Sequence, residues 1–73
     1  MTIERATARR ILELCTKNNI SVAALTNSAG VNPSTVYEFL AGRTKCPTVA
    51  VIKQLCAGFG ITVAEFFSQD YFE

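Results

Sequence analysis

The feature that most constrains the fold is the stretch from Ser21 to Gly42, which reads SVAALTNSAGVNPSTVYEFLAG. Two short segments with apolar residues at helical spacing flank a turn centred on Gly30, and glycine tolerates the positive φ that such a turn requires. Asn32 and Pro33 mark the start of the second segment, because asparagine is a strong N-cap and proline fits the first helical position. The pattern predicts two short helices, at 22–28 and at about 33–41, joined by a tight turn.

Such a pair of helices is the layout of a helix-turn-helix, whose second helix can lie in the major groove of DNA. The spacing predicts that Leu25 packs inward from the first helix and that Val36, Phe39 and Leu40 pack inward from the second. The remaining side chains of the second helix are then available to reach base edges.

Three further helices are expected around this pair. Residues 3–18 form the first, capped by Thr2, with Ala8, Ile11, Leu12 and Cys15 facing inward. Thr48 caps a helix that runs to Phe59, and the capping box of Thr62 and Glu65 starts a short last helix containing Phe66 and Phe67. No segment alternates with a period of two, so the expected fold class is all-α, a compact arrangement of five helices. Residues 1–73 form one domain, with 69–73 as a possible short flexible tail.

Composition narrows the class of protein. With 73 residues and an apolar share of 49%, the chain can bury a small core, and it lacks the run of about 20 apolar residues that spans a membrane. The start of the chain has no signal-peptide pattern, so a cytoplasmic protein is expected.

Charge is distributed unevenly along the chain. Residues 1–53 hold seven basic and three acidic side chains, a balance of +4, whereas residues 54–73 hold three acidic side chains and no basic ones. This split predicts one side that faces a polyanion and an opposite side that avoids it. The alternative is ordinary solvated surface charge.

Three cysteines and no histidine provide little chemistry. The spacing of Cys15, Cys46 and Cys56 does not suit a zinc site, and neither a metal nor a cofactor is expected. Cys15 and Cys56 fall on apolar helix faces, and Cys46 is the cysteine expected to meet solvent. Because no base is placed to activate Cys46 and no glycine-rich phosphate loop is present, the chain is not expected to be an enzyme.

Beyond these patterns, the chain resembles the Cro/repressor-type helix-turn-helix regulators (Cro/C1-type, lambda-repressor-like) of phages and bacteria. The resemblance runs from about residue 10 to residue 67 without a gap. The matching residues are Ile20-Ser21, Leu25, Ala29-Gly30-Val31, Ser34-Thr35-Val36, Gly42, Pro47-Thr48, Leu55, Phe59-Gly60-Ile61-Thr62 and Glu65-Phe66-Phe67. The resemblance implies a sequence-specific DNA-binding transcriptional regulator, a homodimer that recognises a palindromic operator in double-stranded DNA.

The site residues follow from the position of the second helix of the motif. Its outer face and N-terminal end are expected to contact bases through Pro33, Ser34, Tyr37 and Glu38. Contacts to phosphates are expected from Ser21, Val22, Thr35, Arg43, Thr44 and Lys45, with Arg9 or Arg10 as a further contributor. Four neutralised phosphates would give a salt slope of about −3.6.

The outer face departs from the habit of similar proteins. These often carry Gln, Arg, Ser or Asn where this chain has Pro33, Ser34 and Glu38, and commonly Gln where it has Val22. Pro33 can only pack, for example on a thymine methyl, while Glu38 can accept from a cytosine amine and repels phosphates. For Glu38, a solvated surface residue and a base reader remain equal alternatives. Val22 is left with its backbone N–H at the helix N-terminus.

Two further hypotheses concern partners. A protein-interaction module on the same fold is the alternative to DNA binding, with exposed Tyr37, Tyr71 and Phe72 as anchors. A self-complementary patch for dimerisation is expected on the last helix and tail, which carry more apolar surface than one short helix can bury: Val63, Phe66, Phe67, Tyr71 and Phe72.

Overall fold

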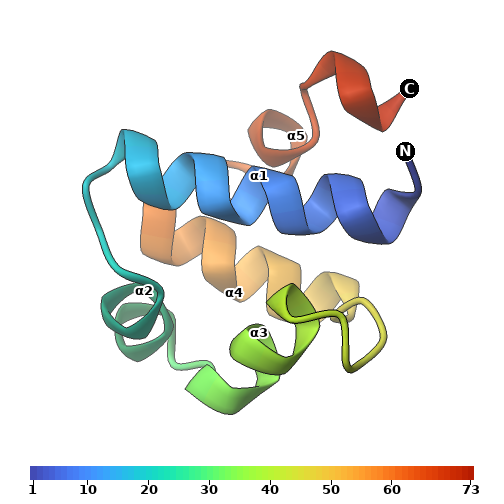
Figure 1. Ribbon diagram of the computed structural model, residues 1–73. Helices are drawn as coiled ribbons and strands as arrows, with labels where there is room; N and C mark the ends of the chain where they lie inside the picture. Colours follow the sequence, from blue (N-terminus) through green and yellow to red (C-terminus); the bar gives the residue numbers. More distant parts are fainter.

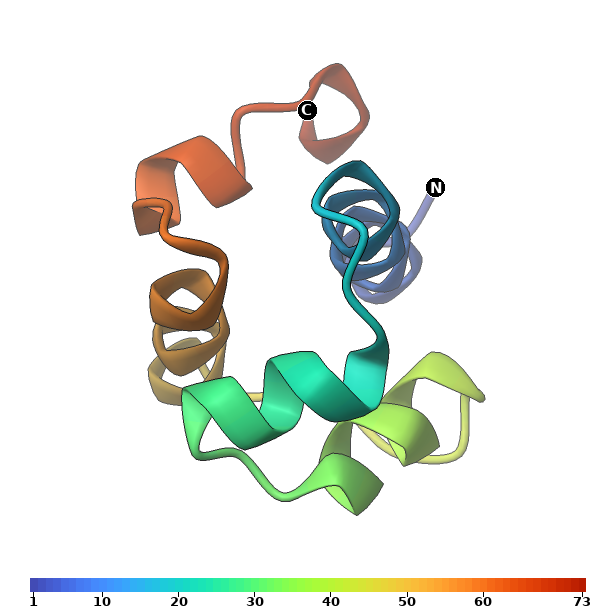
Figure 2. The ribbon, with the colours of Figure 1, turned by 90° about the vertical axis from the view of Figure 1, so that its left-hand side faces the viewer.

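The computed structural model describes all 73 residues, and every regular element in it is helical. The elements are α1 (Ile3–Lys17), α2 (Val22–Ala29), α3 (Pro33–Leu40), α4 (Val49–Phe59), α5 (Val63–Phe66) and a 3-10 helix η1 (Asp70–Phe72). Helices α1 and α4 lie in the middle of the molecule, with α2 and α3 on one side and α5 and η1 on the other (Figure 1, Figure 2). The predicted all-α fold of five helices is confirmed.

Each α-helix begins at a polar side chain that accepts a hydrogen bond from the backbone of the first turn. The amide groups of that turn have no partner within the helix, so a capping oxygen stabilises the helix start. The capping residues are the predicted Thr2, Asn32, Thr48 and Thr62, together with Ser21 at the start of α2. At α5, the Thr62 hydroxyl accepts from the Glu65 N–H and the Glu65 carboxylate accepts from the Thr62 N–H, both at 3.0 Å. The capping box is therefore formed as expected.

The turn between α2 and α3 has the geometry that the sequence indicated. Gly30 has φ +71°, and the next amide, that of Val31, donates to the carbonyl of Thr26 at 3.0 Å. Any other residue type would be strained at this φ. The buried Val31 then packs beneath the turn, which holds α2 and α3 at a fixed angle.

Helix α2 is fixed to the rest of the molecule through α4. At Gly58 of α4, an added Cβ would lie 3.2 Å from the Cβ of Ala29 and 3.2 Å from a methyl group of Leu25. Glycine in a helix costs about 1 kcal/mol relative to alanine. Here the missing side chain lets α2 approach α4 closely, which positions the two helices of the motif against the core.

The core lies at the centre of the five helices. Leu25, Val36, Leu55 and Phe66 are fully buried, as is Ile11 of α1. Cys15 and Cys56 are buried as predicted, and burial raises the pKa of both thiols. Cys46, expected to meet solvent, is half-buried and packs against the core.

The side of α1 that faces the core differs from the prediction at one residue, Leu12. Leu12, expected to face inward, leaves 49% of its surface exposed, whereas Leu14 is only 3% exposed. The buried stripe of α1 follows Ala8, Ile11 and Cys15, and Leu12 lies about 100° away from Ile11 around the helix. Leu12 therefore lies beside the buried stripe of α1, and the prediction that it faces inward is wrong.

The aromatic residues at the end of the chain pack within the molecule. Phe66 is fully buried, and its ring lies 4.8 Å from that of Phe67, which in turn lies 4.9 Å from that of Phe72. The Tyr71 hydroxyl donates to the Glu13 carboxylate on α1 at 2.6 Å, and its ring lies 4.4 Å beneath the Arg9 guanidinium. The surplus of apolar surface that suggested a dimerisation patch is thus largely covered inside the protomer. Residues 70–72 form η1, which packs against α1.

Tyr71 and Glu13 stabilise one another, because the hydrogen bond favours the ionised carboxylate and the neutral phenol. This hydrogen bond is the main reason why the pKa of Glu13 lies below its ordinary value of 4.5. Desolvation first, and then the Glu13 carboxylate, raise the pKa of Tyr71 to about 12. Stability is therefore expected to fall as the pH drops below the ordinary carboxyl pKa, and again as it rises from about 10 to 12.

We predict that Tyr71→Phe lowers the free energy of unfolding by about 1 kcal/mol at neutral pH, a modest value because Glu13 is partly exposed. Urea denaturation followed by circular dichroism measures this loss. When the pH is lowered from about 5 to about 3, the free energy of unfolding should fall less for the variant than for the wild type. Equal acid sensitivity in the two proteins would contradict the link between Tyr71 and Glu13.

Candidate nucleic-acid interface

Helix α3 buries one side and exposes the other. Val36 and Phe39 are buried in the core and Leu40 is half-buried, as the spacing predicted. The four residues expected to contact bases all lie at the surface, with Glu38 half-buried and the others exposed: Pro33, Ser34, Tyr37 and Glu38. The Asn32 side chain accepts from the Ser34 N–H at 2.9 Å, which fixes the N-terminal end of this surface.

Residues from α3 and from the loop before α4 surround one shallow hollow of about 530 Å³. Its lining includes five of the residues predicted to contact DNA: Ser34, Thr35, Glu38, Thr44 and Lys45. Hydroxyl groups and one ammonium group thus meet beside the exposed face of α3. These groups are hydrogen-bond donors of the kinds that bind phosphate and base oxygens.

Arg43 is tied back to α3 by an ion pair. Its Nη1 atom lies 3.4 Å from the Oε1 atom of Glu38, and its backbone N–H donates to the Glu38 carbonyl at 2.9 Å. Both side chains are substantially exposed, at 69% for Arg43 and 43% for Glu38, so the pair contributes about 1 kcal/mol or less. The pair nevertheless neutralises the one acidic group on the outer face of α3. Sequence reasoning treated these two residues separately and missed the pair.

Ser21 and Val22 lie at the N-terminal end of α2, apart from that hollow. The Ser21 hydroxyl accepts from the Ala24 N–H at 3.1 Å, and the Val22 side chain is half-buried against the core. Together they border a separate hollow with the C-terminal end of α1. The amide of Val22 heads the helix, where first-turn N–H groups have no intrahelical acceptor and favour anions.

Two arginines of α1 are engaged elsewhere. Arg10 is only 11% exposed, and it donates to the carbonyls of Phe66 at 2.7 Å and Glu65 at 2.8 Å. It therefore joins α1 to the end of α5, so of the two alternatives, Arg9 or Arg10, it is already engaged within the protein. Arg9 pairs with Glu13 at 3.4 Å and covers the ring of Tyr71, on the side of α5 and η1.

Arg5 is the cation that sequence reasoning missed. It borders a hollow of about 480 Å³ together with Arg43, Thr44 and Lys45, because the start of α1 lies beside the loop that follows α3. Arg5 is exposed. Only the tertiary fold brings residues so distant in the sequence together, so no local pattern could have found this arginine.

The charge split of the sequence corresponds only in part to a separation in space, because Arg9 and Arg10 contact the α5 and η1 end of the chain. The loop carrying Arg43 and Lys45 follows α3, while Glu65, Asp70 and Glu73 lie in and after α5, across α1 and α4 from the motif (Figure 1, Figure 2). The cationic loop and the acidic end of the chain therefore lie on different sides of the molecule. No helix has both the length and the apolar character needed to cross a membrane.

Comparison with known proteins places this geometry in a family. Residues 10–69 match the model of the Cro/C1-type HTH DNA-binding domain, which covers the whole motif and most of the chain. The chain belongs to this family. The match confirms the resemblance found in the sequence and supports a DNA-binding regulator as the general class of function.

A solved structure agrees with the family match. The crystal structure of the prophage Lp1 protein 11 is 32% identical to this Cro/C1-type chain and superposes with a TM-score of 0.88, over 99% of this chain and 95% of the other. Among the curated proteins no match was found. The fold and the motif are therefore shared over nearly the full length of both chains.

Proposed function

We propose that this Cro/C1-type domain is a sequence-specific transcriptional regulator that places α3 in the major groove of operator DNA. The observation that carries the proposal is the exposed face of α3 beside the cationic loop. Ser34, Tyr37 and Glu38 are positioned to read base edges, and Pro33 packs against them or a thymine methyl. The family match supports the same assignment.

The phosphate contacts surround this reading face. Arg43, Thr44 and Lys45 bind the backbone next to α3, and Thr35 assists from the helix itself. Ser21 and the amide of Val22 bind a second phosphate at the N-terminal end of α2, where the helix favours an anion. Arg5 adds a cation from the start of α1, in place of Arg10.

Two protomers act together on a two-fold symmetric site. Three charged phosphate contacts in each protomer, from Arg5, Arg43 and Lys45, would give a salt slope of only about −2.7, modest for a regulator that must select one site. Binding two linked half-sites multiplies the affinity without new contacts. The 73 residues act as one domain within this dimer.

DNA binding is tested by titrating a random-sequence duplex with the protein at about 50 mM and about 200 mM salt, with fluorescence anisotropy as the measurement. We expect binding at micromolar protein or below at the lower salt, and at least about fortyfold weaker binding at the higher salt. Absence of salt-dependent binding at micromolar protein would refute the proposal. Sedimentation without DNA tests the dimer, and a monomer at high micromolar concentration would count against it.

Glu38→Gln should bind the random-sequence duplex about two- to fivefold more tightly than the wild type. The change removes a negative charge from the face of α3 and releases Arg43 from its ion pair for a phosphate. Asp70→Asn is the matched control, since it removes an exposed acid on the opposite side of the molecule. Equal effects of the two substitutions would show that Glu38 does not face DNA.

A further inference from the structure

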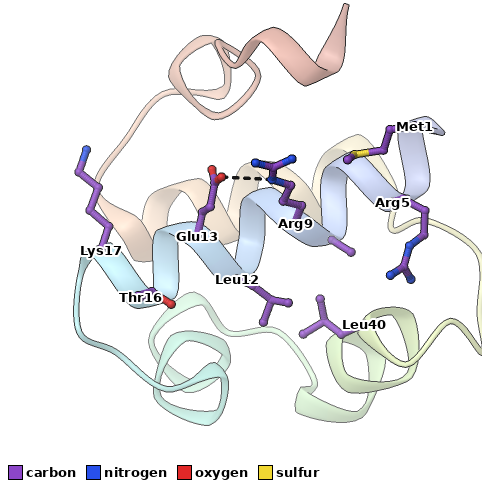
Figure 3. Close-up of a pocket in the computed structure, with 9 residues that line it drawn as sticks. Met1, Arg5, Arg9, Leu12, Glu13, Thr16, Lys17 and Leu40 are labelled. Atoms are coloured by element: carbon purple, nitrogen blue, oxygen red, sulfur yellow. Dashed lines mark ion pairs between the residues drawn. The ribbon is translucent and has the colours of Figure 1, made fainter.

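A second surface, distinct from the reading face, lies between α1 and the end of α3. It is an open groove of about 650 Å³, lined by side chains along the whole of α1 and by Leu40 of α3. The side chains of Leu12 and Leu40 point toward one another across the groove (Figure 3). Leu12 is 49% exposed and Leu40 half-buried, so the floor of the groove is apolar and open to solvent.

The rim of the groove is basic. Arg5, Arg9 and Lys17 border it, against a single acid, Glu13. The Glu13 carboxylate is already paired, with Arg9 at 3.4 Å, Arg10 at 3.6 Å and the Tyr71 hydroxyl at 2.6 Å. Arg5 and Lys17 form no ion pair within the protein. The groove therefore presents an apolar floor with uncompensated positive charge toward its two ends.

This charge argues against a second copy of the chain as the occupant. In a symmetric dimer the same patch faces itself, which would bring Arg5 and Lys17 of both copies into one interface. Like charges across an interface cost binding energy, whereas opposite charges provide steering and specificity. The occupant that fits the groove carries acidic residues beside apolar ones.

The shape of the groove indicates the form of that occupant. Its lining extends along the 15 residues of α1, a length of about 22 Å, which matches a partner helix of about four turns. Amphipathic helices bind such grooves through apolar residues at spacings of three and four. We propose that the groove between α1 and α3 binds an acidic amphipathic helix of a regulatory partner protein, with apolar residues on Leu12 and Leu40 and carboxylates toward Arg5 and Lys17.

The probe for this proposal is a synthetic helical peptide of about 15 residues, with leucines on one face and glutamates flanking them. Its counterpart replaces every glutamate by lysine. Fluorescence anisotropy without DNA should show that the glutamate peptide binds at least about tenfold more tightly than the lysine peptide. Equal binding of the two peptides, or no binding of the glutamate peptide, would overturn the proposal.

Protein variants locate the site. Leu12→Glu should weaken binding of the glutamate peptide by at least about tenfold, while Val49→Glu, a matched change at an exposed apolar residue of α4, should leave it unchanged. The double variant Arg5→Ala with Lys17→Ala should weaken binding of the glutamate peptide but not of the lysine peptide. Circular dichroism verifies that each variant is folded. An unaffected Leu12→Glu variant, or self-association that depends on Leu12, would contradict this site. The proposal does not rest on DNA binding, so the two can fail independently.

Discussion

Replacing both Arg43 and Lys45 by alanine is expected to remove about two thirds of the salt dependence of DNA binding. Each phosphate contact contributes about 0.9 to the slope, so the magnitude should fall by about 1.8 per protomer from a starting value near 2.7. If the two proteins bind equally at about 1 M salt, this change of slope corresponds to about 60-fold weaker binding in about 0.1 M salt. The loss is general, because contacts to phosphates carry no sequence information.

Lys17→Ala is the matched control for the single substitution Lys45→Ala. Both substitutions remove one exposed ammonium group, but Lys17 is the last residue of α1, whereas Lys45 belongs to the loop that follows α3. Lys45→Ala should lower the slope by about 0.9, and Lys17→Ala should change it little. If the two lysines had equal effects, attraction to DNA would reflect net charge alone and the cationic loop would not be the binding surface.

The largest effect on stability is expected for Phe66→Ala, which should cost about 3 to 5 kcal/mol of unfolding free energy. Phe66 is fully buried, contacts the ring of Phe67 edge-on, and lies where Arg10 holds the end of α5 against α1. A domain of this size has a total stability of about 4 to 11 kcal/mol, so the substitution should remove a large part of it.

Phe66→Leu is the control for this substitution, since it keeps most of the apolar volume and should cost clearly less than the alanine variant. Urea denaturation monitored by circular dichroism gives both values, with a stabilising osmolyte added if the alanine variant is unfolded in buffer. A loss below about 1.5 kcal/mol for Phe66→Ala would mean that α5 is not part of the cooperative core.

Local chemistry explains why so much of the fold could be predicted from the sequence. The helix starts at Ser21, Asn32 and Thr62 depend on side chains within three residues, and the turn at Gly30 depends on one φ angle. Inward and outward faces of α3 follow from helical spacing alone. Leu12 shows the limit of that reasoning, because helix phase is uncertain by one residue when apolar residues are adjacent.

The candidate site was predicted less completely because its decisive contacts join distant residues. Arg10 binds carbonyls 55 and 56 residues away, and Tyr71 binds Glu13 across 58 residues. The proximity of Arg5 to the loop after α3 likewise follows only from the packed structure. Arg10 is held at α5 and Arg5 lies beside the loop because of tertiary packing, which no local pattern encodes.

The central claim is that α3 reads a specific DNA sequence, and selection of bound duplexes from a random pool tests it most directly. We expect enrichment of a palindrome whose half-sites lie about one helical turn apart, about 34 Å between centres. Glu38→Gln should alter the preference at one base pair in each half-site, because a carboxylate accepts from cytosine and an amide favours adenine. Failure to enrich any sequence, from a protein that is folded and binds DNA, would contradict the account.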